Sequence, residues 1–254
     1  MDTWHLKNKK ALVTGGSRGI GRAVAEEFLS LGAEVLITAR TGREVDAAVA
    51  ELDSIASAIH GLEADVSKAV DRNKIISWID RNWGRLDILV NNAGINIRKP
   101  SIAYSPEEVM QVLDIDLVAP FELCRALFAL LKSGRSPSVI NVSSVAGSYD
   151  VNTGAPYGMA KAGLIQLSRN LAVEWAPQGI RVNTVSPWFT ATPLARRIME
   201  DPQKLEAITS RTPLGRIAQS DEIASVIAFF AMEKASYVTG QNIDVDGGVT
   251  SRLL

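Results

Sequence analysis

Short apolar runs alternate along the whole chain with longer stretches whose apolar residues recur at helical spacing. The first run is ALV at 11–13, and after a glycine-rich turn Ile20, Val24 and Phe28 follow every four positions. Further apolar runs that predict strands lie at 34–38, 61–66, 87–91, 138–143, 181–186 and 242–245, and helical patterns lie at 106–132, 155–176 and 220–233. Strands that alternate with helices favour right-handed crossovers. The pattern therefore predicts an α/β fold with a doubly wound parallel sheet and helices on both faces.

One stretch interrupts this alternation near residues 188–218. It is irregular and begins just after Pro187, and it contains Pro193, Pro202 and Pro213. A long irregular segment within a compact domain is typical of an active-site lid. Since no internal repeat, low-complexity tract or linker divides the chain, we expect residues 1–254 to form one domain with a lid-like insertion.

Composition excludes several classes of protein. Hydrophobic residues make up 46% and charged residues 22% of the chain, as in an ordinary globular protein with a buried core. The net charge of −1 creates no field that would attract nucleic acid or a membrane surface. Cys124 is the only cysteine and there are two histidines, so we expect neither a disulfide nor a bound metal. The N-terminal segment lacks the apolar stretch of a signal peptide, and we expect a cytoplasmic protein.

The glycine-rich turn, TGGSRGIG at 14–21, lies between the first predicted strand and the first predicted helix. Glycines let the backbone turn tightly and let a pyrophosphate approach the amides of a helix N-terminus, where the helix dipole favours anions. The spacing is Gly-x-x-x-Gly-x-Gly rather than the commoner Gly-x-Gly-x-x-Gly. A dinucleotide site is the reading that we adopt, and a plain strand-to-helix turn is the alternative.

The end of the second predicted strand bears on which dinucleotide fits. An acidic residue there would bind the ribose 2′-hydroxyl of NAD. The strand instead ends in Thr38-Ala39 and is followed by Arg40, and Arg18 lies in the glycine turn. Guanidinium groups match the oxygens of a 2′-phosphate. We therefore predict NADP(H), the alternative being that both arginines are simply solvated.

A second group of polar residues predicts proton transfer. Ser144 follows a strand, Tyr157 comes thirteen residues later, and Lys161 comes four residues after Tyr157. Positions i and i+4 share one face of a helix, so the phenol and the ammonium can point into one site. A nearby ammonium favours the phenolate and lowers the pKa of the phenol. Tyr157 can then exchange a proton with a substrate oxygen to which Ser144 donates a hydrogen bond.

Together these motifs resemble the short-chain dehydrogenase/reductase family, over nearly the whole chain. The resemblance extends to Asp65-Val66, NNAG at 91–94, Asn183, Pro187 and Asp246-Gly247-Gly248. It implies a seven-stranded doubly wound sheet and a homodimer or homotetramer. Within the family, the stretches at 9–35 and 166–188 are most similar to tropinone-reductase-like proteins, and NNAGINIRKP at 91–100 is shared with bacterial sugar and polyol dehydrogenases.

The resemblance also implies the composition of the cofactor site. Asp65 and Val66 would lie beside the adenine, Lys161 would bind the nicotinamide ribose, and Pro187, Thr190 and Thr192 would flank the carboxamide. Tyr157 would lie against the nicotinamide. The remaining cofactor-binding positions are Gly15, Ser17, Arg18, Gly19, Ile20, Gly21, Arg40, Asn92, Ala93 and Gly94.

Two residues depart from the family pattern. Asp116 replaces the usual Asn that is thought to hold a proton-relaying water; it either serves catalysis, through that water or Lys161, or only satisfies a backbone amide. Trp188 replaces the usual Gly, and its indole either forms a wall of the substrate pocket or packs within the lid.

These observations predict an oxidoreductase that uses NADPH to reduce a small ketone to a secondary alcohol, reversibly. Substrate would contact Ser144, Tyr157 and Trp188. Two alternatives remain: an NAD(P)-linked sugar or polyol dehydrogenase, and a non-catalytic NADP(H)-binding protein. The surplus of apolar positions on the 106–132 and 155–176 helices favours an interface between copies of the chain.

Overall fold

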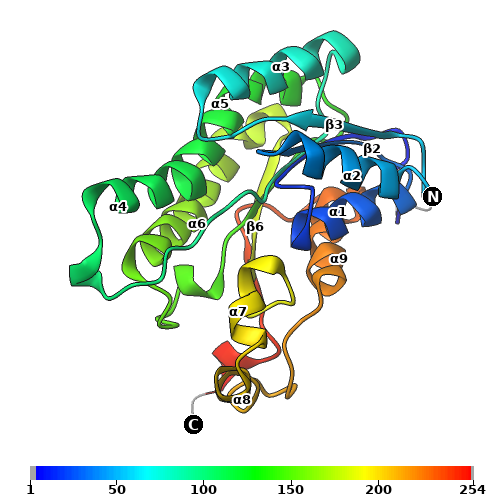
Figure 1. The fold of residues 1–254 in the computed structure, drawn as a ribbon. Helices are drawn as coiled ribbons and strands as arrows, with labels where there is room; N and C mark the ends of the chain where they lie inside the picture. Colours follow the sequence, from blue (N-terminus) through cyan, green and yellow to red (C-terminus); the bar gives the residue numbers. More distant parts are fainter. Residues whose placement is uncertain (1–3, 253–254) are drawn as a thin grey trace.

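A single parallel sheet forms the centre of the molecule (Figure 1). The structure is a computed structural model, and it describes residues 4–252. The strand order is β3-β2-β1-β4-β5-β6-β7, and every neighbouring pair is parallel. The strands are β1 (Lys10–Thr14), β2 (Glu34–Ala39), β3 (Ile59–Glu63), β4 (Ile88–Asn91), β5 (Ser138–Val142), β6 (Arg181–Pro187) and β7 (Asn242–Val245). The predicted seven-stranded doubly wound sheet is confirmed.

Helices cover both faces of the sheet because its strands are apolar on both sides. They are α1 (Gly19–Ser30), α2 (Gly42–Leu52), α3 (Ala69–Trp83), α4 (Pro106–Leu113), α5 (Ala119–Lys132), α6 (Ala155–Trp175), α7 (Arg196–Met199), α8 (Pro202–Thr209) and α9 (Ser220–Ala231). Along β1, Val13 packs in a buried cluster with Phe28 of α1 and Phe230 of α9, whereas Leu12 packs in a second cluster with Leu127 of α5. Because successive side chains of a strand point to opposite faces of the sheet, the strands contribute to one hydrophobic core on each face.

The third strand begins and ends earlier than the predicted range of 61–66. Its register against β2 pairs Val35 with Ile59 and Ala39 with Glu63. Gly61 lies under α2, where a Cβ atom would come 2.4 Å from Val45, so the strand packs tightly against that helix. Residues 64–66 therefore follow the strand, and this places Asp65 and Val66 in the loop at its carboxyl end.

The stretch predicted as one helix at 106–132 is divided by a turn of π-helix. Ser105 begins α4 with a capping box, since its Oγ accepts from the Glu108 amide at 3.3 Å and Glu108 Oε2 accepts from the Ser105 amide at 3.0 Å. The π-helical turn, Asp114–Val118, then precedes α5. A π-helical turn adds one residue to a helix and often lies at a functional site. Here it contains the buried Asp116.

The irregular segment after β6 forms a closed excursion that holds α7 and α8. Its base is fixed by two backbone hydrogen bonds, from the Ala218 amide to the Phe189 carbonyl at 3.0 Å and from the Ala191 amide to the Ala218 carbonyl at 2.8 Å. In Figure 1, α7 and α8 lie beyond the carboxyl end of β6, next to the last described residues of the chain. Within residues 4–252, no helix is long and apolar enough to cross a membrane.

Candidate active site

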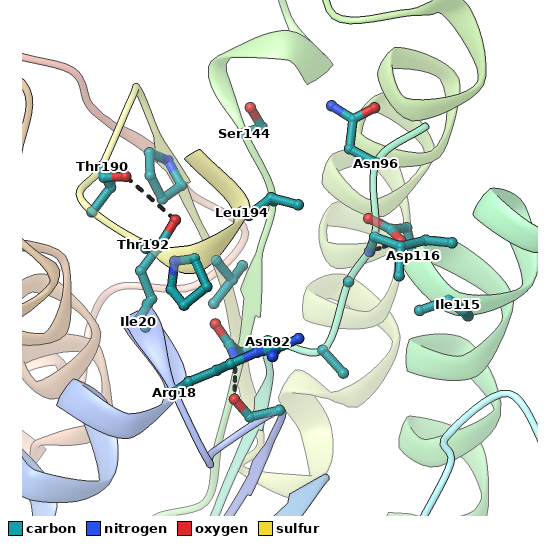
Figure 2. Close-up of a pocket in the computed structure, with 18 of the residues that line it drawn as sticks. Arg18, Ile20, Asn92, Asn96, Ile115, Asp116, Ser144, Thr190, Thr192 and Leu194 are labelled. Carbon is teal, nitrogen blue, oxygen red and sulfur yellow. Dashed lines mark hydrogen bonds between the residues drawn. The ribbon is translucent and has the colours of Figure 1, made fainter. Parts of the chain in front are cut away.

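A cavity of about 600 Å³ opens at the carboxyl ends of the central strands. Parallel α/β sheets bind ligands at this edge, where the order of the strands reverses. The lining residues include every sequence-predicted site residue except Gly21. Figure 2 shows Ser144 and Asn96 at one end of this cavity and Arg18 at the other.

The glycine turn owes its shape to close backbone contacts. Gly15 and Gly19 have φ angles of 65° and 57°, which L side chains rarely adopt. At Gly21 a Cβ atom would lie 2.2 Å from the Gly15 carbonyl oxygen, so this glycine supports the turn from behind without lining the cavity. Asn92 ties the turn to β4, because its Nδ2 donates to the carbonyl oxygens of Thr14 at 2.9 Å and Gly15 at 3.1 Å.

The end of the cavity beside α2 carries both signs of charge. Arg18 and Arg40 line it, as expected, but so does Glu44, which the sequence did not single out. Glu44 Oε1 forms an ion pair with Arg18 Nη1 at 3.3 Å, and both side chains are largely exposed. Asp65 lies in the same cavity, where its Oδ1 accepts hydrogen bonds from the amide and the hydroxyl of Ser67.

At the opposite end, Lys161 is buried among polar partners. Its Nζ donates to the Val142 carbonyl oxygen at 3.0 Å and lies 3.1 Å from Asp116 Oδ2. The ammonium also lies 5.5 Å from the centroid of the Tyr157 ring. The predicted pairing on one helix face therefore brings the phenol and the ammonium together, and Ser144 lines the same cavity.

Asp116 makes both of the contacts that the sequence left open. Its side chain is fully buried, and Oδ1 accepts from the Ile95 amide at 2.8 Å. Oδ2 forms the ion pair with Lys161, and within the described chain no group donates a hydrogen bond to it. Gly94 leaves room for this pair, since a Cβ atom there would come 3.0 Å from Oδ2.

Burial and charge act in opposite directions on these groups. Burial raises the pKa of Tyr157, Lys161 lowers it, and Asp116 raises it, with a net increase. The expected lowering by Lys161 is present, but desolvation outweighs it in the protein alone. Burial also disfavours the Lys161 ammonium, yet Asp116 and Tyr157 more than offset this effect and raise the pKa of Lys161. Burial raises the pKa of Asp116, against the influence of Lys161.

Trp188 lines the cavity and contacts residues of the irregular segment that follows β6. Its indole Nε1 donates to Thr212 Oγ1 at 3.1 Å, and its ring packs edge-on against Phe189. The indole therefore packs within this segment and lines the cavity as well. Nearby, Thr190 is buried and Thr192 Oγ1 donates to the Thr190 carbonyl oxygen at 3.3 Å, so both residues stabilise the start of the same segment (Figure 2).

Two further polar residues line the cavity beside Tyr157. Asn96 and Arg98 come directly after the NNAG motif, within a stretch already noted for its likeness to sugar and polyol dehydrogenases. Asn96 Nδ2 donates to Thr153 Oγ1 at 2.5 Å, and Arg98 Nε donates to the same oxygen at 3.4 Å. In the sequence, only their position two and four residues after the NNAG motif indicated that they could line the cavity.

Comparison with known proteins agrees with this geometry. The family model described as enoyl-(acyl carrier protein) reductase matches residues 15–250. A tropinone reductase homolog of Arabidopsis thaliana is 42% identical over 97% of this chain and 94% of its own length. The chain belongs to the short-chain dehydrogenase/reductase family.

Solved structures of short-chain dehydrogenases superpose over nearly the full length. A gluconate 5-dehydrogenase from Burkholderia cenocepacia, in complex with NADP and tartrate, has a TM-score of 0.94 and 30% identity, covering 99% of each chain. The Pseudomonas aeruginosa RhlG complex with NADP has a TM-score of 0.93 and 34% identity, covering 98% of this chain and 99% of RhlG. The chain is thus an oxidoreductase of a family that uses NAD(P), as predicted.

Proposed function

We propose that this protein uses NADPH to reduce a small ketone to a secondary alcohol, reversibly. One observation carries the proposal: a single cavity holds the glycine turn at one end and Ser144, Tyr157 and Lys161 at the other. The glycine turn fits a dinucleotide, because positive φ angles at Gly15 and Gly19 fold the backbone tightly where it lines the cavity at the start of α1. Intact proton-transfer residues argue against a purely non-catalytic binding protein.

The bound nicotinamide would supply a hydride to the carbonyl carbon. Tyr157 would donate its hydroxyl proton to the carbonyl oxygen as that oxygen gains charge, which yields the alcohol and leaves a phenolate. Ser144 would donate a hydrogen bond to the same oxygen. Lys161 would stabilise the phenolate by its charge and bind the nicotinamide ribose. In the direction of oxidation, the same phenolate would accept the proton of the alcohol.

Asp116 would act as a positioning residue. It holds the Lys161 ammonium at 3.1 Å and is itself held by the Ile95 amide. An asparagine could accept from the same amide but could not supply the negative charge.

A preference for NADP(H) rests on Arg18 and Arg40 at the end of the cavity beside α2. The exposed ion pair of Arg18 with Glu44 contributes little free energy, on the order of 0–1 kcal/mol, so a 2′-phosphate can displace the carboxylate. The two similar structures that contain NADP, those of the gluconate 5-dehydrogenase and RhlG, support the same choice. The segment near 188–218 would act as the lid over the bound substrate.

A sugar or polyol dehydrogenase is the second candidate. The gluconate 5-dehydrogenase among the solved structures favours it, as does the polar Asn96 and Arg98 pair beside Tyr157. Both candidates share the same chemistry and differ in the substrate and the direction of reaction.

The test is a turnover screen of ketones and polyols with NADPH and NADH, beside a Tyr157→Phe variant. We expect NADPH-linked reduction with the parent protein and a loss of turnover of roughly 10²–10⁴-fold in the variant. NADPH binding, measured by fluorescence, should persist in the variant. Equal Michaelis constants for the two cofactors would refute the cofactor preference, and full activity of Tyr157→Phe would refute the mechanism.

A further inference from the structure

A second cavity adjoins the first where the lid approaches the body of the protein. Its volume is about 1290 Å³, and Asn96, Arg98 and Trp188 line both cavities. The second cavity extends to α8, to the loop at 149–152 and to the residues near 249–252. A molecule whose reactive carbon lies beside Tyr157 can therefore extend into this space without leaving the protein.

The charged side chains that line the second cavity are mostly basic. Arg98, Lys204, Arg211 and Arg252 are the cations, and among the described residues that line the cavity Asp150 is the only carboxylate. Lys204 is partly neutralised by Asp201, with a Nζ–Oδ2 distance of 2.9 Å. Even without Lys204, basic side chains outnumber acidic ones around this cavity, although the net charge of the whole chain is −1.

Two of these cations lack an acidic partner. Within residues 4–252 neither Arg98 nor Arg211 forms an ion pair, and the Arg98 side chain makes one long hydrogen bond, to Thr153 Oγ1 at 3.4 Å. Partial burial nevertheless lowers the pKa of Arg98, while the charge of Tyr157 acts in the opposite direction. A guanidinium placed at a cavity without a carboxylate is equipped to bind an oxyanion from solution.

Asn96 adds an unused polar atom at the junction of the two cavities. Its Nδ2 is engaged by Thr153, but its Oδ1 is buried and has no hydrogen-bond partner among the described residues. A buried acceptor without a partner destabilises the protein unless a ligand or water donates a hydrogen bond to it. A hydroxyl group of the substrate would satisfy it.

We propose that the substrate carries an oxyanion group, a carboxylate or a phosphate, which binds Arg98 and Arg211 in the second cavity while its carbonyl lies at Tyr157 and Ser144. This inference rests on the proposed function, because it places the reacting carbonyl at the same residues. It also excludes a class: a ketone with a protonated amine would meet uncompensated positive charge in the second cavity.

The test compares matched pairs of ketones that differ in charge. Levulinate is compared with methyl levulinate, dihydroxyacetone phosphate with dihydroxyacetone, and N-methylpiperidone serves as the cationic ketone. We expect kcat/KM with NADPH to be roughly tenfold or more higher for an anionic member than for its neutral partner, and lowest for the cation. The pair with the larger ratio shows whether a carboxylate or a phosphate is preferred.

Arg98→Gln and Arg211→Gln should each reduce the ratio of anionic to neutral turnover several-fold, mainly through KM. The ratio cancels any effect that Arg98 has on the pKa of Tyr157. Arg98→Lys should restore part of it. Arg81→Gln is the matched control, because Arg81 is exposed on α3 and outside both cavities.

A binding measurement separates this inference from the proposed function. Calorimetric titration of levulinate and methyl levulinate into protein saturated with NADP⁺ measures the preference without turnover. Tighter binding of the anion, lost in Arg98→Gln, supports the inference even if no ketone in the screen is reduced. Equal affinity for acid and ester, or an anion preference that survives both arginine substitutions, overturns it.

Discussion

The two ends of the active-site cleft are built in different ways. At the dinucleotide end, backbone conformation does most of the work: Gly15 and Gly19 adopt positive φ angles, and Gly21 lies against the Gly15 carbonyl. At the end proposed for the substrate, side chains such as Arg98 and Arg211 surround a larger space. A backbone site tolerates little change, whereas a side-chain site can be altered one residue at a time. This difference explains how members of one family can share a cofactor and act on different substrates.

Among the variants considered, Gly21→Ala should weaken dinucleotide binding the most. The new Cβ would lie 2.2 Å from the Gly15 carbonyl oxygen and 2.4 Å from Asn92 Nδ2, so the turn must open. We expect NADPH to bind at least about tenfold more weakly and stability to fall by roughly 1–3 kcal/mol. Isothermal titration and thermal unfolding measure the two effects.

Gly179→Ala provides the matched control. Unlike Gly21, Gly179 has a positive φ angle, of 75°, and a Cβ there meets nothing within 4 Å, so this variant adds a methyl group without a close contact. The control should lower stability by backbone strain alone and leave cofactor affinity intact. If both variants bind NADPH equally well, the backbone of the turn does not determine affinity.

Asp116→Asn tests the charge at the junction of the two ends. The Asp116 carboxylate raises the pKa of both Tyr157 and Lys161, so its removal should lower both. Oxidation of an alcohol requires Tyr157 to accept a proton, so its rate rises with pH through the pKa of Tyr157. The rising part of the pH profile should therefore move to lower pH, as measured by kcat over a pH series.

Asp114→Asn is the control for that experiment, because Asp114 shares the π-helical turn but does not line the cavity. Its pH profile should match that of the parent protein. An unshifted profile in Asp116→Asn would leave Asp116 with a purely structural role.

Thr212→Val should loosen the segment near 188–218 without altering the cofactor site. It removes the acceptor of the hydrogen bond of 3.1 Å from the partly buried Trp188 indole, and the loss of one such bond costs about 0.5–1.5 kcal/mol. We expect KM for the ketone to rise several-fold at constant NADPH affinity. Thr209→Val lies one turn away on α8 and makes no bond to Trp188, so it should change neither constant. A matching change in NADPH affinity would show that the two ends are not independent.

Glu44→Gln should have the smallest effect and the opposite sign. It removes the carboxylate that competes with a 2′-phosphate for Arg18, and an exposed ion pair contributes on the order of 0–1 kcal/mol. NADPH should bind up to about fivefold more tightly, with little change for NADH. Glu51→Gln, which breaks the neighbouring ion pair with Arg22 outside the cavity, should leave both affinities unchanged. Weaker NADPH binding in Glu44→Gln would contradict the assignment.

The sequence predicted those parts of the molecule that local patterns determine. The strands follow from apolar runs, and Ser144, Tyr157 and Lys161 follow from motif spacing, because a helix fixes which residues share a face. The π-helical turn at Asp116 was missed, since a regular apolar period continues through it. The end of β3 was predicted too far along the chain because Ala64 and Val66 are apolar and buried, as in a strand, although they lie in the loop that follows it.

The cavity-lining residues that the sequence analysis did not identify are brought to the cavity by tertiary contacts. Glu44 reaches the cofactor cavity only because α2 begins beside the glycine turn. The basic second cavity joins residues that are more than 150 positions apart, Arg98 and Arg252, and no local pattern connects them. The predicted oligomer stays a prediction, although Phe121 of α5 and Val173 of α6 expose 41% and 79% of their surface and are suited to an interface.

The π-helical turn also restricts where single residues can be deleted from the chain. Removing one residue from 114–118 would restore a regular helix, and α4 would rotate by about 100° relative to α5. Val112, now fully buried, would then turn away from the core. Single-codon deletions should therefore be tolerated better among the exposed residues 213–216 than in this turn, even though both lie outside the sheet.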